Sequence, residues 1–212
     1  MQNYSSLDRL IIEFDRRLRT LTQQKRSAQR DNPAKDMRDA ELSEQQRKQA
    51  GRLMRVNHAG EVAAQGLYHG QALTARNQGT ITSMQQSAAE EEDHLAWCED
   101  RLTELQHQPS VLGPMWYFGS YTLGATAGLF GDRWSLGFVG ETEKQVENHI
   151  TDHLAKLPEE DKKSRAILAQ MQEDEIKHGE KAMQMGGEEL PAPIKSAMTL
   201  VSKVMTTGAY WI

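Results

Sequence analysis

The sequence predicts an all-α protein whose core is a four-helix bundle. Apolar residues recur at helical spacing over four long segments, and the alternation typical of strands is weak. In addition, one pattern of glutamate and histidine occurs twice at helical spacing. The 212 residues are enough for one domain with a sizeable core, so we expect residues 1–212 to form a single domain.

The expected helices follow one another between polar or glycine-containing breaks. Residues 1–42 are expected to hold an N-terminal amphipathic helix, over about residues 6–21, and a polar linker. The bundle is expected over residues 43–185, with helices at about 43–76, 80–107, 132–156 and 159–185. Residues 186–212 are expected to hold a C-terminal amphipathic helix, over about residues 191–207.

The crossover between the second and third bundle helices, residues 108–131, has an unusual composition. No Asp, Glu, Lys or Arg occurs from residue 105 to residue 131, a length that would allow a membrane span. Its glycines and Pro114 make it a poor lone helix. Two interpretations stay open: a buried crossover, or a crossover that also contacts a bilayer or lines an apolar substrate channel. The candidates for such contacts are Trp116, Tyr117, Phe118, Leu123, Leu129 and Phe130.

Composition excludes several classes of function. The net charge of −5 gives no general case for nucleic acid as a partner, and neither a P-loop nor a Rossmann glycine pattern occurs. Cys98 is the single cysteine, so no disulfide framework is possible within the chain and a reducing compartment is expected. The N-terminus lacks the long apolar core of a secretory signal.

Three Glu-x-x-His motifs each place a carboxylate and an imidazole on one helix face, one turn apart. These motifs are Glu91/His94, Glu104/His107 and Glu175/His178. The first and third lie 84 residues apart and are each preceded by a single glutamate about thirty residues earlier. The second has no such partner and lies at a predicted helix end, so we expect it at the surface.

The two preceding glutamates complete a repeated pattern. Glu61 precedes Glu91 by 30 residues, and Glu143 precedes Glu175 by 32 residues. In an antiparallel helix pair, residues at the same height are equally far from the turn. The midpoints of both pairs fall in predicted turns, so two helical hairpins each bring one Glu and one Glu-x-x-His to the same level.

Helical faces distinguish the candidate ligands from their acidic neighbours. Three glutamates lie on apolar stripes of their helices: Glu91, Glu143 and Glu175. Glu90 lies on a polar stripe, and Glu90 and Asp93 are expected to face water, whereas Glu92 stays undecided. Glu147 lies one turn after Glu143 and stays a rival as a ligand or as a residue that orients one.

A buried carboxylate needs compensation, because an unpaired buried charge is costly. Four glutamates bring four negative charges to one level, and two divalent cations cancel them. Mixed carboxylate and imidazole ligands suit iron or manganese, whereas the absence of thiolates disfavours structural zinc. The same inventory is typical of ferritin-like di-metal proteins. The predicted metal ligands are Glu61, Glu91, His94, Glu143, Glu175 and His178.

Four further residues are candidates for orienting these ligands. They are His149, Glu147, His58 and Tyr68. The alternative for the histidines is an ordinary core or surface position, and for Tyr68 it is packing. We assign no separate catalytic residue beyond the metal ligands.

The motifs resemble those of the demethoxyubiquinone hydroxylase family. The resemblance rests on "RVNHAGEVAAQGLYHGQ", "EEDHL", Glu143 and "DEIKHG", and it covers nearly the whole chain after about residue 45. It implies a ferritin-like bundle with a carboxylate-bridged di-iron centre held by the six ligands predicted above. His149 matches a histidine of the family, and Ile150 stands where eukaryotic members usually have tyrosine. No organelle presequence is evident, so the chain looks like a bacterial member.

The resemblance also implies an activity. We expect a monooxygenase that hydroxylates the ring of a polyprenylated demethoxy-benzoquinol in ubiquinone biosynthesis, with two Fe2+ ions as cofactor and O2 as co-substrate. The expected reductant is NADH or the quinol itself. Expected partners are the membrane surface and other ubiquinone-biosynthesis proteins, with the chain peripheral on the cytoplasmic face of the bacterial cell membrane. The uncharged crossover would then accommodate the prenyl tail.

Two other classes of protein compete with this expectation. A ferritin-like iron-binding or storage protein without oxygenase activity would use similar ligands, but it would not need so long an uncharged crossover. A helical scaffold at a membrane surface, without metal, is the third interpretation.

Overall fold

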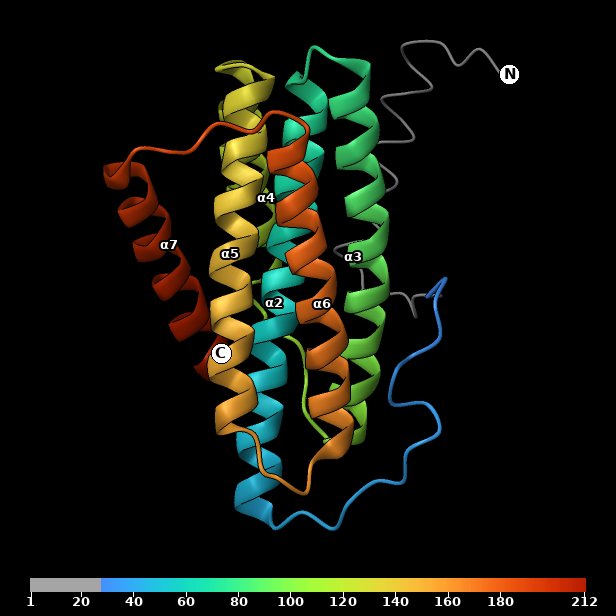
Figure 1. Cartoon of the computed structure of the whole chain (residues 1–212). Coiled ribbons are helices and arrows are strands. Elements are labelled where there is room, and N and C mark those ends of the chain that lie inside the picture. The colour runs from blue at the N-terminus through green and yellow to red at the C-terminus, as the bar shows by residue number, and fades with distance from the viewer. Residues whose placement is uncertain (1–27) are drawn as a thin grey trace.

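The computed structural model describes residues 28–212, and every regular element in this range is an α-helix (Figure 1). The all-α, ferritin-like prediction is confirmed. Helices α2 (Glu44–Thr74) and α3 (Gln78–Glu104) form one antiparallel hairpin. Helices α5 (Asp132–Lys156) and α6 (Lys162–Gln184) form the second, and the four helices lie side by side in the bundle.

The helix ends follow local side-chain chemistry. Ser43 and Gln46 form a capping box at the start of α2, and Asp161 accepts a hydrogen bond from the backbone N–H of Ser164 at 3.0 Å to cap α6. Helix α3 ends at Glu104, three residues before the predicted boundary, because Gln106 has a φ of 58° that no helix continues. The predicted N-terminal helix over residues 6–21 lies outside the described residues.

Two apolar clusters stand at different levels of the bundle, above and below the predicted ligands. One contains Met54, Cys98, Ile150 and Met171, and the other contains Tyr68, Ala88, Val139 and Ala182. In all four bundle helices, the predicted ligand lies between a member of one cluster and a member of the other. Water is therefore excluded from the ligand level on both sides along the bundle axis.

The crossover differs from the expectation, because it forms a regular helix, α4 (Gly113–Leu129), that packs along α2. Glycines let the two backbones touch: a Cβ atom at Gly66, Gly70 or Gly124 would lie 2.1–2.3 Å from a carbonyl oxygen of the facing helix. The oxygens belong to Tyr117, Tyr121 and Leu67 respectively. The glycines that weaken α4 as an isolated helix thus create the contact that stabilises it.

Helix α7 (Ala192–Trp211) lies at the edge of the bundle beside α2 and α5 (Figure 1). Its Ala209 is buried against Val56 and Ala59 of α2, and Trp116 of α4 packs on the same cluster. Apolar side chains on and next to α4 and on α7 remain exposed, and we call them the apolar face. They are Met115, Phe118, Leu123, Leu129, Phe130, Leu200, Val201, Val204 and Trp211.

Two of the six candidates for bilayer or channel contact do not face outward. Tyr117 is fully buried, and its hydroxyl lies 2.9 Å from Nδ1 of His69 on α2. Trp116 is half-buried against α7. Among residues 28–212, none of the helices combines the length and the hydropathy that a membrane crossing needs.

A glycine substitution tests the backbone contact between α2 and α4. Gly70→Ala places a Cβ atom against Tyr121 and Ala125, so we expect it to lower the free energy of unfolding by about 1–3 kcal/mol in denaturant titrations. Gly60→Ala on the same helix is the matched control, because its Cβ would meet nothing within 4 Å. This control should raise the free energy of unfolding, by up to about 1 kcal/mol. Equal effects of the two substitutions would contradict the contact.

Candidate metal centre

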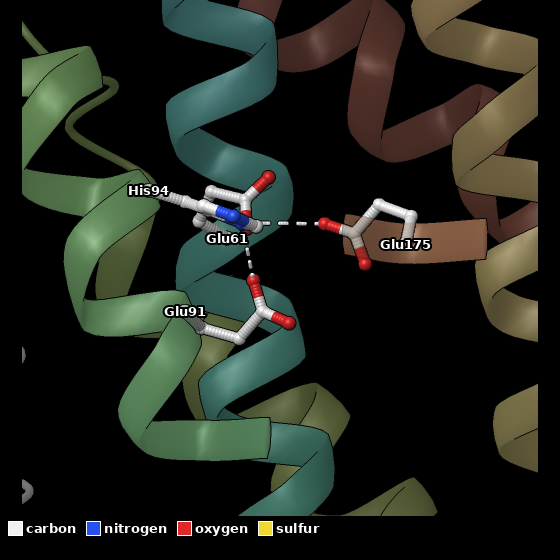
Figure 2. Close-up of side chains that lie close together, drawn as sticks. All are labelled: Glu61, Glu91, His94 and Glu175. Carbon is white, nitrogen blue, oxygen red and sulfur yellow. Dashed lines mark hydrogen bonds and ion pairs between the residues drawn. The ribbon is translucent and has the colours of Figure 1, made fainter. Parts of the chain in front are cut away.

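Four of the predicted ligands come together in one buried group. Glu61 of α2, Glu91 and His94 of α3, and Glu175 of α6 each offer an atom within 4.8 Å of the others (Figure 2). None of the four is more than 3% exposed. The two hairpins therefore meet at one level, as the repeated spacing predicts.

The imidazole of His94 has its two nitrogens in different surroundings. Its Nδ1 faces three carboxylates, at 2.9 Å from Glu91, 3.3 Å from Glu175 and 3.5 Å from Glu61. Its Nε2 lies 3.2 Å from Oδ2 of Asp174. Since Asp174 holds Nε2, Nδ1 is the nitrogen that is directed to the carboxylate group.

The imidazole of His178 has the same arrangement. Its Nδ1 lies 3.2 Å from Glu91 and 3.4 Å from Glu175, and its Nε2 lies 2.6 Å from Oε2 of Glu90. Glu90, expected to face water, is only half-exposed and binds this histidine. In each of these two Glu-x-x-His motifs, the acidic residue directly before the glutamate binds the histidine of the other motif: Asp174 binds His94, and Glu90 binds His178.

Glu143 of α5 completes the set of buried glutamates. It is 2% exposed and accepts a hydrogen bond from the hydroxyl of Tyr68, so this tyrosine orients a predicted ligand. Its rival Glu147 is half-buried, and the backbone carbonyl of Glu147 accepts hydrogen bonds from Thr151 and Gln172. Burial therefore favours Glu143 as the ligand.

The donor atoms fit a metal better than they fit a hydrogen-bonded core. Oε1 of Glu91 and Nδ1 of His178 lie 3.2 Å apart, within ion-pair distance, yet among the described residues neither of these buried atoms has a hydrogen-bond partner. Buried polar atoms are rarely left in this state. A divalent cation accepts electron pairs from both atoms, and carboxylates with imidazoles suit iron or manganese.

The charges of the group shift its pKa values in opposite directions. Burial, and next the charge of a neighbouring glutamate, raises the pKa of Glu61 and of Glu143 well above its ordinary value. Burial also acts to raise the pKa of Glu91, but the charge of His94, the nearby imidazole of His178 and the hydrogen bond with His94 hold this pKa well below its ordinary value.

The histidines take up the compensating positive charge in the absence of metal. Burial acts to lower the pKa of His94, but the charge of Glu91 and hydrogen bonds to Asp174 and Glu175 raise it well above its ordinary value. For His178, burial is likewise outweighed by Glu175 and Glu91, which raise its pKa to about 12. Both imidazoles are therefore protonated at neutral pH until a cation replaces the protons.

His58 and His149, two candidates for orienting the ligands, do not contact the carboxylate group; their partners are other residues. Nε2 of the buried His58 lies 3.3 Å from Glu99. The ring of His149 lies 3.8 Å from that of His153 between centroids, at an angle of 57°, and both line a cavity of about 720 Å³ between α2, α5 and α7. Burial, with the charge of Lys156, lowers the pKa of His149 to about 4, so its ring is neutral.

The third Glu-x-x-His motif stays apart from the centre. Glu104 is exposed and forms ion pairs with Arg101 and Lys163, at 2.6 and 2.7 Å. His107 lies beyond the end of α3, where its Nδ1 is 3.2 Å from Arg55. The two side chains therefore do not share a helix face.

Sequence reasoning missed Asp174, Asp93 and Arg30. The expectation that Asp93 faces water is wrong: it is 3% exposed and binds Nε of Arg30 at 2.8 Å. Asp174 could have been found as the acid directly before Glu175, the position that Glu90 has before Glu91. Arg30 carries no local signal, because its partners on α3 and α6 are 63 and 144 residues away.

Known proteins are similar to this chain over most of its length. Residues 48–209 match the family described as Ubiquinone biosynthesis protein COQ7. The chain is similar to the 3-demethoxyubiquinol 3-hydroxylase of Nitrosococcus oceani, with 54% identity over 98% of this chain and 97% of that protein. It is also similar to the proteins of the same name from Acinetobacter baumannii, at 52% identity over the full length of both, and from Ralstonia pickettii, at 54% identity over 97% of this chain and all of that protein.

Metal binding is expected to release protons. His94 and His178 are protonated at pH 7 without metal, whereas an imidazole must be neutral to bind a cation, so affinity should rise with pH. Calorimetric titration with Co2+ at pH 7, in buffers of different ionisation enthalpy, should show release of about one proton or more per ion. Heats that do not depend on the buffer would contradict this electrostatic description.

Proposed function

The chain belongs to the Ubiquinone biosynthesis protein COQ7 family, and on that premise we propose that it is a 3-demethoxyubiquinol 3-hydroxylase. The proposal rests on one observation: four buried glutamates and two buried histidines lie at the same height in the bundle, between two apolar clusters. An iron-storage protein could use the same donors, but the named relatives are similar over nearly their full length.

We propose two Fe2+ ions as the cofactor, held by Glu61, Glu91, Glu143, Glu175, His94 and His178. Bound there, the ions would activate O2 so that one oxygen atom is added to the quinol ring and the other leaves as water. The chain's own residues position this chemistry: Tyr68 orients Glu143, and Asp174 and Glu90 hold the outer nitrogens of the histidines.

The balance of the reaction requires two electrons besides the O2. We propose NADH or the quinol itself as their source, the former directly or through a partner protein. The apolar clusters that flank the ligand level keep bulk water from the site and so limit side reactions with solvent there.

The apolar face supports peripheral attachment to a membrane. On α4, Leu123 and Phe118 are 45% and 51% exposed, and Phe130, next to α4, is 73% exposed. Clustered exposed apolar side chains indicate contact with a partner or a membrane. We propose that this face docks on the cytoplasmic side of the bacterial cell membrane and admits the polyprenyl tail, and that other ubiquinone-biosynthesis proteins act alongside.

Complementation tests the activity. In a bacterial strain that accumulates demethoxyubiquinone, the wild-type chain should restore ubiquinone. Glu91→Ala and Glu143→Ala should abolish this restoration, because each removes a ligand of the proposed centre, and the purified variants should contain less iron. The matched controls are Glu92→Ala, an exposed neighbour of Glu91, and Glu147→Ala, one turn from Glu143; both should behave like the wild type.

Two results would overturn the assignment. Failure of the wild-type chain to restore ubiquinone would exclude the hydroxylase activity, whatever the iron content. Equal iron in the wild type and in both ligand variants would exclude the proposed centre.

Membrane attachment is tested by sedimentation with lipid vesicles. The double variant Phe118→Ser/Leu123→Ser removes two exposed apolar side chains from α4, and we expect it to reduce the bound fraction several-fold at unchanged helix content. Ile176→Ser, on α6, is the control, because this side chain is 39% exposed but lies outside the apolar face. Unchanged binding of the double variant would show that α4 is not the contact.

A further inference from the structure

Arg30, which precedes the four-helix bundle in sequence, reaches the edge of the metal centre. Its Nε lies 2.8 Å from Oδ2 of Asp93 on α3, and its Nη1 lies 2.6 Å from Oδ2 of Asp174 on α6. Oδ1 of Asp93 also accepts a hydrogen bond from the backbone N–H of Gln29 at 2.6 Å. One guanidinium therefore joins the N-terminal segment to both hairpins.

Arg30 shares its aspartate with a predicted metal ligand. Oδ2 of Asp174 binds both Nη1 of Arg30 and Nε2 of His94, while Oδ1 is held by Gln170 and Lys177 of the same helix. The guanidinium also lies 4.9 Å from the ring centre of Trp97, which stands 5.4 Å from the ring of His94. Arg30 thus limits the movement of both groups that contact the outer side of this imidazole.

The other histidine lacks an equivalent clamp among the described contacts. Nε2 of His178 binds Glu90, whose side chain is 40% exposed, whereas the side chain of Asp174 is 6% exposed. The two halves of the centre have matching ligands, but within residues 28–212 only the half with His94 is fixed by an ion pair to a segment outside the bundle.

We propose that Arg30 is a positioning residue of the metal centre, which fixes the ring of His94 with Nδ1 towards the carboxylates by holding Asp174 and Asp93. The planar guanidinium holds its donor nitrogens apart in a rigid fork, so Nε and Nη1 reach two carboxylates at once, whereas lysine has a single donor nitrogen. Because only one of the two histidines is held in this way by residues 28–212, the two metal positions are unequal, and the position served by His94 has the higher affinity.

This inference rests on the proposed metal centre and is tested without reference to turnover. The full-length, metal-free protein is titrated with Co2+ under anaerobic conditions, and the visible absorption of the bound ion reports its ligand geometry. Wild type should bind two equivalents with different affinities. Arg30→Gln should weaken the tighter equivalent by about tenfold and change its absorption band, since loss of an outer partner of a metal-binding histidine has effects of this size.

Three further variants separate positioning from a general effect on the segment. Arg30→Lys should recover only part of the affinity, and Asp174→Asn should affect the same equivalent as Arg30→Gln. The matched control is Arg38→Gln, the same exchange at an exposed position eight residues further along the segment, which should behave like the wild type. Thermal unfolding of each metal-free variant establishes that it is folded.

Distinct outcomes overturn distinct statements. If the wild type binds no Co2+, the proposed metal centre fails. If it binds two equivalents but Arg30→Gln leaves both affinities and the spectrum unchanged, weakens both equally, or is matched by Arg38→Gln, the role of Arg30 is wrong while the centre stands.

Discussion

The burial of four carboxylates at one level is the constraint on which the rest of the structure depends. Glu61, Glu91, Glu143 and Glu175 come from four different helices and are at most 3% exposed. Their mutual repulsion would separate the two hairpins unless positive charge stood between them. The apolar clusters on either side supply the packing that holds the helices together, and the two protonated imidazoles supply the positive charge.

Much of this arrangement could be predicted because its causes are local or periodic. Helix α5 has the predicted bounds, and α2 and α6 begin and end within a few residues of theirs, because caps and turn residues act over a few positions. The height of the site in the bundle could be predicted because Glu61 and Glu91, and likewise Glu143 and Glu175, are about equally far in sequence from the turn between their helices. The choice of Glu91 over its acidic neighbours followed from the helical face, which the burial of Glu91 and exposure of Glu92 reproduce.

What could not be predicted depends on contacts between distant parts of the chain. Asp93 is expected at the surface from its acidic run alone, and only the ion pair with Arg30, 63 residues away, accounts for its burial. Intrinsic propensity disfavours α4, and only the facing glycines of α2 show how its backbone is stabilised. His149 matches a family histidine, yet its place beside α7 follows from where the C-terminal helix packs.

The backbone contact between α2 and α4 has a consequence for how such a chain can change over generations. On the outer side of α4, one apolar side chain can replace another without disturbing a neighbour, so many substitutions there would be neutral. On the inner side, a single added methyl group meets a carbonyl oxygen, so accepted changes would have to occur in both helices together. Descendants of this sequence should therefore drift rapidly on one face of α4 while the opposite face stays fixed.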